Sequence, residues 1–203
     1  MKIENKIDSS SYGLCLLSVS QLTEFLKENK VRKKSLIDFF NVNESLSNKS
    51  LSQGAVLPLN LQLFNQFYFD IYEQGDSPLF GEAEWGQCLH KRSFRLQVEA
   101  EDVYLCGMDV LNDWRPKRFE QPVLGYVIGK GGGATTRCFY YEAQQVLVAK
   151  GCYLVDVRGY KRRKPTGDSD EDYGIAFELK RVESFAEAPP VPESILFQFS
   201  DLD

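Results

Sequence analysis

The chain has 203 residues and a formal net charge of −5 at pH 7, with 43% hydrophobic and 26% charged residues. These are ordinary globular values, and they exclude wholesale disorder. A free-standing nucleic-acid-binding protein usually has a strong basic excess, because neutralising phosphates supplies most of its affinity. The acidic balance therefore restricts any nucleic-acid contact to a local basic surface, or to one shared with other subunits.

The cysteines and the apolar runs bear on the compartment. The five cysteines are odd in number, and no two of them form a Cys-x-x-Cys pair. The segment Met1–Ser10 is polar, and the apolar stretch Leu14–Val19 is too short for the core of a signal peptide. No run approaches the roughly 20 apolar residues of a membrane span. We therefore expect reduced thiols, a cytoplasmic location and no membrane contact.

The first fifty residues are predicted to be helical. Ser18 is followed three residues later by Gln21, which makes an acceptable capping box. The segment Gln21–Asn29 then has apolar residues at helical spacing, and a second helix is expected over Lys34–Phe40. The stretch Asn41–Gly54 is rich in Asn and Ser and is interpreted as a loop.

From about residue 56 the pattern changes to short strands separated by Gly, Pro, Asn and Asp. The segment Leu61–Tyr72 is ambiguous between helix and strand, and Ile195–Phe199 is a candidate edge strand. The remaining predicted strands are Arg95–Glu99, Val103–Cys106, Val123–Ile128, Arg137–Glu142, Gly151–Arg158 and Ile175–Lys180. The predicted fold is α+β, with N-terminal helices (1–50) followed by a mostly antiparallel β-sheet domain (56–203).

A glycine cluster at 129–133 offers one candidate site. Lys130, Gly131 and Gly132 could place backbone amides and an ammonium group against a phosphate of a bound RNA. The spacing of the glycines and the lysine does not fit a Walker loop. A dinucleotide-binding loop leads into a helix, whereas a strand is expected after this cluster, so that interpretation does not fit either. The alternatives are a plain connection between two strands or a loop that acts on nucleotides.

A basic run offers the second candidate site. It interleaves one aromatic residue with five cations: Arg158, Tyr160, Lys161, Arg162, Arg163 and Lys164. Arginine beside an aromatic ring suits contact with an RNA backbone and stacking on a base. The acidic segment 168–172 follows directly, so a solvated loop that neutralises its own charge is the alternative. That segment does not fit a calcium loop, because Leu179 stands where a bidentate Glu is required.

Little in the sequence indicates catalysis. His90 is the only histidine, and no His/Cys cluster has zinc spacing. We therefore expect no catalytic residue, no metal and no cofactor. Four large aromatic residues are expected in the core and are assigned no site: Phe80, Trp85, Tyr104 and Trp114.

The middle of the chain carries a resemblance over about fifty residues. The segment Pro78–Trp85 reads Pro-Leu-Phe-Gly-Glu-Ala-Glu-Trp and is followed by an alternating strand over Ser93–Glu99. Val103–Gly107 reads Val-Tyr-Leu-Cys-Gly, and Trp114 and the segment Pro122–Tyr126 come later. This order resembles the small accessory subunit of subtype III-D CRISPR effector complexes. That family has a Leu-Phe-Gly or Leu-Tyr-Gly turn, a charged residue before a Trp, a Tyr-Leu-x-Gly strand and a later Trp.

The resemblance implies a structural role in type III antiviral defence. Such subunits belong to a crRNA-guided complex, so the implied partners are other CRISPR effector subunits and crRNA, with target RNA as a further candidate. The resemblance implies no catalytic residue. Two alternatives stay open: a cytoplasmic immunity protein that neutralises a toxin by direct binding, and an enzyme that acts on a phosphorylated substrate through Lys130.

Overall fold

In the computed structural model, the described residues are 5–9, 13–61, 66–129, 137–166, 172–186, 188–190 and 196–197. Their strands are β1 (Lys6–Asp8), β2 (Leu14–Ser18), β3 (Val56–Leu61), β4 (Gln66–Glu73), β5 (Trp85–Val98), β6 (Val103–Gly107), β7 (Val123–Gly129), β8 (Arg137–Val146), β9 (Gly151–Arg162), β10 (Tyr173–Val182) and β11 (Leu196–Phe197). The helices are α1 (Val19–Glu28), α2 (Leu36–Val42) and α3 (Glu44–Ser52), with short 3₁₀ turns η1 (Met108–Leu111) and η2 (Pro116–Glu120).

The strands form two sheets. One has the order β1-β4-β10-β9-β5, and the other has the order β11-β3-β2-β6-β8-β7. Every described pairing is antiparallel except β4 with β10 and β3 with β11. The α+β class with mostly antiparallel sheets is therefore confirmed. The expected order of elements is wrong in part, because β1 and β2 precede the helices, and η1 and η2 follow β6.

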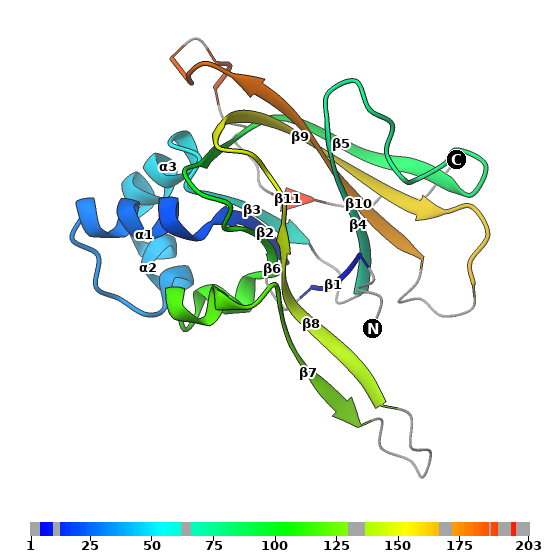
Figure 1. The fold of residues 1–203 in the computed structure, drawn as a ribbon, viewed down its shortest axis with the longest axis horizontal. Helices are drawn as coiled ribbons and strands as arrows, with labels where there is room; N and C mark the ends of the chain where they lie inside the picture. The colour runs from blue at the N-terminus through cyan, green and yellow to red at the C-terminus, as the bar shows by residue number, and fades with distance from the viewer. Residues whose placement is uncertain are drawn as a thin grey trace.

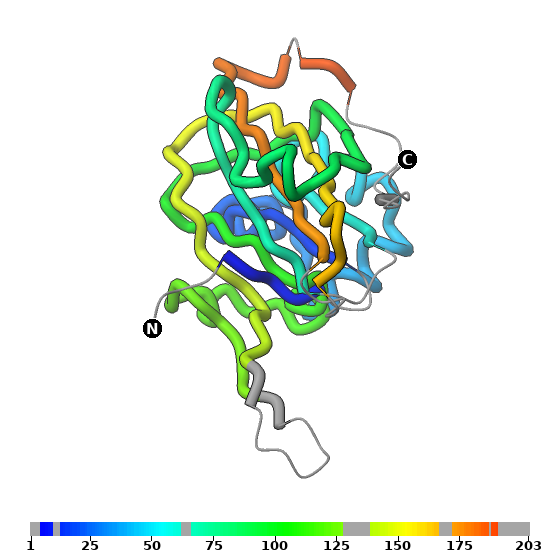
Figure 2. Tube along the Cα trace, turned by 90° about the vertical axis from the view of Figure 1, so that its right-hand side faces the viewer, coloured from blue at the N-terminus to red at the C-terminus, as the bar shows by residue number. Residues whose placement is uncertain are grey.

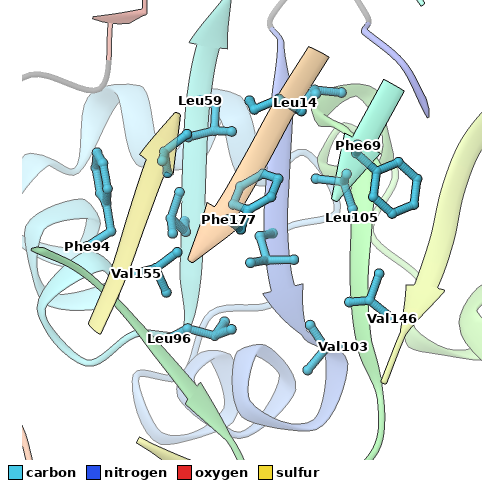
Figure 3. Packing of buried hydrophobic residues seen from close by; sticks show 14 of the residues in the cluster. Leu14, Leu59, Phe69, Phe94, Leu96, Val103, Leu105, Val146, Val155 and Phe177 are labelled. Carbon is cyan, nitrogen blue, oxygen red and sulfur yellow. The ribbon is translucent and has the colours of Figure 1, made fainter. Parts of the chain in front are cut away.

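The two sheets and the helices make three layers (Figure 1). The largest apolar cluster lies between the sheets, where Leu14, Leu59 and Leu105 of one sheet meet Phe94, Val155 and Phe177 of the other (Figure 3). A second cluster lies between the six-stranded sheet and the helices. The five-stranded sheet thus has one face in the core, and its other face turns away from the helices.

Strand β2 lies at the centre of the six-stranded sheet, between β3 and β6. Leu14 and Leu16 belong to the core between the sheets, whereas Cys15 and Leu17 belong to the core against the helices. A strand that is buried on both faces has no alternation of apolar and polar residues. This strand also pairs with strands that follow residue 56, so the first fifty residues contribute to the sheet as well as to the helices.

The N-terminal cap of α1 is confirmed. The Ser18 hydroxyl accepts a hydrogen bond from the backbone N–H of Gln21 and donates one to Asp102 Oδ1, at 2.7 Å. The second carboxylate oxygen of Asp102 accepts the Ser20 backbone N–H at 2.6 Å. The cap therefore ties the start of α1 to the loop before β6. The second predicted helix is also found, as α2, which starts two residues later than expected.

The loop predicted over Asn41–Gly54 is wrong, because most of it forms α3. Ser and Asn have modest helix propensity, and here packing overrides it: Ser50 is buried and its hydroxyl bonds to the Ser47 carbonyl. Gly54 ends the helix with φ of +66°, a conformation that favours glycine. A Cβ atom at Gly54 would lie 2.7 Å from the backbone nitrogen of Gln97, which also holds this position to glycine.

The predicted strands after residue 56 are confirmed as parts of β5 to β10. The ambiguous segment at 61–72 is strand where the structure describes it, mainly as β4. The candidate edge strand at 195–199 contains β11, which lies at the edge of its sheet. Strand β5 starts at Trp85, well before the predicted Arg95, and has two register shifts against β9. Such bulges interrupt the alternation of apolar residues and hide the strand in the sequence. None of the described helices has the length and apolar character needed to cross a membrane.

Candidate binding surface

The outer face of the five-stranded sheet brings together two segments that are distant in the sequence. One is the basic run, which continues along β9 and just past its end. The other is the turn at 78–85, which folds across β9 and β10. The backbone N–H of Leu79 donates to Asp70 Oδ2 on β4 at 2.8 Å, which ties the turn to the sheet. We call this combined region the β9 surface.

Phe80 is the centre of the β9 surface. Its ring stacks on Tyr160 with centroids 4.6 Å apart and contacts the edge of Trp85 at 5.0 Å. The ring rests on Gly174 of β10, where an added Cβ would come within 2.3 Å of it. Tyr160 is therefore only 5% exposed, and burial raises the pKa of its phenol. The Tyr160 ring is covered by Phe80 in this structure.

Arg162 lies over two aromatic rings. Its guanidinium carbon is 4.4 Å from the centroid of Trp85 and 5.8 Å from that of Tyr68. Lys6 of β1 lies over the same Tyr68 ring at 4.9 Å, and Arg162 also pairs with Glu84 at 3.5 Å. Cation–π contacts of this kind hold a cation in place while part of it stays in contact with water. They build a row of cations and rings at this end of the sheet.

Arg158 is half-buried and is paired with an acid within the sheet. Its guanidinium forms an ion pair with Glu178 on the neighbouring strand β10. Tyr72 lies nearby, and burial raises its pKa to about 12, although the charge of Arg158 acts in the opposite direction. Arg158 is therefore balanced by a carboxylate within the sheet, which favours a supporting role for it.

The end of the basic run is more open. Arg163 is exposed, and it joins β9 to the turn through two hydrogen bonds. Its backbone N–H donates to the Glu84 carbonyl and its Nε donates to the Glu82 carbonyl, both at 2.9 Å. Lys164 is exposed and Lys161 is half-buried. The cations best placed to meet a partner are thus those at the end of β9.

The other candidate residues are partly outside the described chain. Lys130, Gly131 and Gly132 lie outside the described residues, between β7 and β8, as does most of the acidic segment at 168–172. Asp172 is described and is buried, and its Oδ1 accepts hydrogen bonds from the backbone and side chain of Thr166. This carboxylate therefore closes a loop rather than pairing with the basic run.

The single histidine lies farther along the same sheet face. His90 Nε2 is 3.3 Å from Asp156 Oδ2 and 3.3 Å from Arg92 Nε, at a bulge where Ser93 has φ of +66°. Asp156, Arg92 and Ser93 also line a pocket of about 800 Å³ between β9, β10 and the segment after β10. Within the described residues, no three His, Cys, Asp or Glu side chains gather closely enough to hold a metal ion.

Sequence reasoning found the basic run but missed its surroundings. Phe80 and Trp85 are buried, as expected, at 7% each, and so are Tyr104 and Trp114, at 2% and 8%. Sequence reasoning assigned Phe80 and Trp85 no part in a site, and it also missed Lys6 and Tyr68, which lie beside Arg162, come from β1 and β4 and carry no local signal. The alternation within β4, with Phe67 and Phe69 in the core, places Tyr68 on the opposite face once β4 is known to be a strand.

Comparison with known proteins adds no relative: no protein-family model, no curated protein and no solved structure matches this chain.

Proposed function

We propose that this chain is a non-catalytic accessory subunit of a type III CRISPR effector complex, which binds neighbouring subunits and crRNA. The resemblance of the middle of the chain to the subtype III-D accessory subunit supports this proposal. The structural observation that carries it is the packing of Arg162 on Trp85. Trp85 belongs to the turn that opens the resembling segment, and Arg162 belongs to the basic run that suits RNA, so this contact joins the two.

The β9 surface divides into a support and a contact edge. Tyr160 and Phe80 are buried, Arg158 is paired with Glu178, and these contacts hold the shape of the surface. Arg163 and Lys164 are exposed at the end of β9, where they can approach phosphates of a single RNA strand. Arginine and aromatic groups side by side are the usual elements of sequence-tolerant RNA contact.

The same surface offers a contact for a protein neighbour. Leu79, at the tip of the turn, is 69% exposed although it is a large apolar residue. It lies beside Phe80, which is fixed in the sheet, so the backbone at the tip is anchored. A rigid, exposed apolar residue next to cations suits the edge of a subunit interface that also touches RNA.

The test is a tagged pull-down from the native host, with and without ribonuclease, with proteins read by mass spectrometry and RNA by sequencing. The proposal predicts several large CRISPR proteins and short repeat-derived RNAs. The double variant Arg163→Glu/Lys164→Glu should lose RNA more steeply as salt is raised. The matched control is Arg32→Glu/Lys33→Glu, which changes net charge equally at two exposed residues between α1 and α2. Equal RNA retention by both double variants would contradict the assignment.

A second candidate is an immunity protein that neutralises a basic toxin. It is favoured by four exposed carboxylates within a short segment that contains no cation: Glu73, Asp76, Glu82 and Glu84. Immunity proteins of this kind present carboxylates to a basic partner. In the same pull-down, one small basic protein without RNA would support this candidate and exclude the CRISPR assignment.

A further inference from the structure

A group of polar residues lies at the bulge of β5, beside the pocket of about 800 Å³: His90, Arg92, Ser93 and Asp156. The pocket is also bordered by the segment after β10. That segment lies at the end of the molecule opposite to strands β7 and β8 (Figures 1 and 2). The group shares none of its residues with the β9 surface.

The carboxylate of Asp156 is held in place by the backbone of the bulge. Its Oδ1 accepts the Ser93 N–H at 3.1 Å, where β5 has a register shift against β9 and Ser93 has φ of +66°. Serine rarely adopts this conformation, and such strain persists where the surrounding structure imposes it. The second oxygen, Oδ2, lies 3.3 Å from His90 Nε2. The bulge therefore fixes Asp156 against the histidine ring.

The Nε2 atom of His90 lies between two groups that require opposite protonation of the ring nitrogen. Arg92 Nε is 3.3 Å away and can only donate, whereas the carboxylate of Asp156 can only accept. A ring nitrogen carries either a proton or a lone pair, so it cannot serve both partners at once. The neutral ring can accept the bond from Arg92. The protonated ring has hydrogen on both nitrogens and can bond only to Asp156.

Arg92 is the most exposed of the three side chains. It is 72% exposed, compared with 20% for His90 and 28% for Asp156. Its Nε is 3.8 Å from Asp156 Oδ2, and an exposed ion pair of this length contributes little. Loss of the bond to His90 therefore leaves Arg92 held only weakly.

The other charged groups around this site balance one another. On β9 and β10 and in the segment that follows, two cations and two carboxylates face or line the same region: Arg158, Lys180, Glu178 and Glu183. Arg158 is opposite His90 in the register, and Glu178 pairs with it. Lys91 is next to His90 in β5, and alternation along the strand places it on the opposite face. Asp156 and Arg92 are therefore the charges that decide the behaviour of His90.

We propose that His90 is a proton-dependent switch for Arg92. When the ring is neutral, Nε2 accepts the Arg92 Nε–H and holds the guanidinium group against the sheet. When the ring is protonated, Nε2–H donates to Asp156, the two positive charges repel, and Arg92 is released at the edge of the pocket. This goes beyond the function proposed for the β9 surface and does not depend on it.

The test is nuclear magnetic resonance of the full chain, in which His90 gives the only histidine ring signals. The ring nitrogens of His90 and the Nε and Cζ signals of Arg92 are followed between about pH 8 and pH 5, the range in which histidine changes charge. In the neutral ring the proton should be on Nδ1, with Nε2 unprotonated. As the ring becomes protonated, the Arg92 signals should move, with the same midpoint, to the position of an arginine surrounded by water.

Two variants separate the partners of the ring. Arg92→Ala should move the proton of the neutral ring to Nε2, because Asp156 is then the partner that remains. Asp156→Asn should shift the response of Arg92 to lower pH, because the protonated ring loses its carboxylate. The matched control is Lys180→Ala, which removes another exposed cation from the same pocket and should leave the signals of His90 and Arg92 unchanged.

Three results would overturn the proposal. The first is a set of Arg92 signals that stay constant while His90 becomes protonated. The second is a neutral ring that carries its proton on Nε2 in the unaltered chain. The third is a ring whose protonated nitrogen is the same with and without Arg92. The Arg163→Glu/Lys164→Glu variant should behave as the unaltered chain does in this titration, which separates the switch from the β9 surface.

Discussion

Phe80 stacks face to face on Tyr160, with ring centroids 4.6 Å apart and an interplanar angle of 22°. The two residues are eighty positions apart in the chain, and the end of the turn, at Glu84 and Trp85, is also joined to β9 by backbone pairing. The stack therefore fastens the turn at 78–85 to β9 and fixes the shape of the β9 surface. The contact is open to direct tests of stability.

Replacement of Phe80 by Ala should destabilise the protein by about 3 kcal/mol, because a buried aromatic ring is lost and its partners are left without contact. The measurement is the free energy of unfolding from a urea titration followed by tryptophan fluorescence and circular dichroism. Leu79→Ala is the matched control, since Leu79 is 69% exposed, and it should change the free energy by less than about 0.5 kcal/mol. Equal effects of the two variants would contradict the packing described.

Gly174→Ala should destabilise the protein through Phe80. The added methyl group would come within 2.3 Å of the Phe80 ring, so the ring must move, at a cost of about 1–3 kcal/mol. In a chain that already carries Phe80→Ala, the same substitution should be close to neutral. This double-mutant cycle measures the coupling between the two positions. A Gly174→Ala effect that is the same in both backgrounds would exclude the contact.

The cap of α1 gives an independent prediction. Asp102→Ala removes the acceptor of the Ser18 hydroxyl and of the Ser20 backbone N–H, and should cost about 1–2 kcal/mol of unfolding free energy. The neighbouring Glu101 is exposed, and its side chain is not needed for the bond from Gln145 to its carbonyl, so Glu101→Ala should have little effect. Thermal unfolding at neutral pH distinguishes the two variants.

Stability should fall in alkaline solution because of Tyr72 and Tyr140. Burial raises the pKa of each phenol from 10 to about 12, so the folded state favours the neutral form. This contribution is fully present below pH 10, where the unfolded phenol is also neutral, and it is lost as pH rises through about 12. Urea midpoints measured from pH 8 to pH 11.5 should decline above pH 10, and Tyr72→Phe should reduce the decline. A decline that Tyr72→Phe and Tyr140→Phe leave unchanged would contradict this origin.

Local pattern was sufficient to predict the elements that are exposed on one face. Ser18 with Gln21 indicated the start of α1, and alternation indicated β9 and β10, because one face of each strand lies in the core. Strand β2 was missed because both faces are buried, which removes the alternation. Helix α3 was missed because its stability comes from packing, although Gly54 is a recognisable helix end.

The β9 surface was predictable only in part for a similar reason. The basic run is continuous in the sequence, so its composition indicated a binding segment. Its partners come from elsewhere: β9–β10 pairing brings Glu178 within reach of Arg158, and the parallel β4–β10 pairing brings Tyr68 near Arg162. Long-range pairing of this kind leaves no local trace, so the neutralisation of Arg158 and the covering of Tyr160 could not be read from the chain alone.

The most direct test of the proposed function is ultraviolet cross-linking of the affinity-purified complex from the native host, followed by mass spectrometry of peptides that carry a nucleotide remnant. The account predicts cross-links within residues 158–164 or within the turn at 78–85, at the contact edge near Arg163 and Lys164. Cross-linked RNA confined to other parts of the chain, or a complex without RNA, would contradict it.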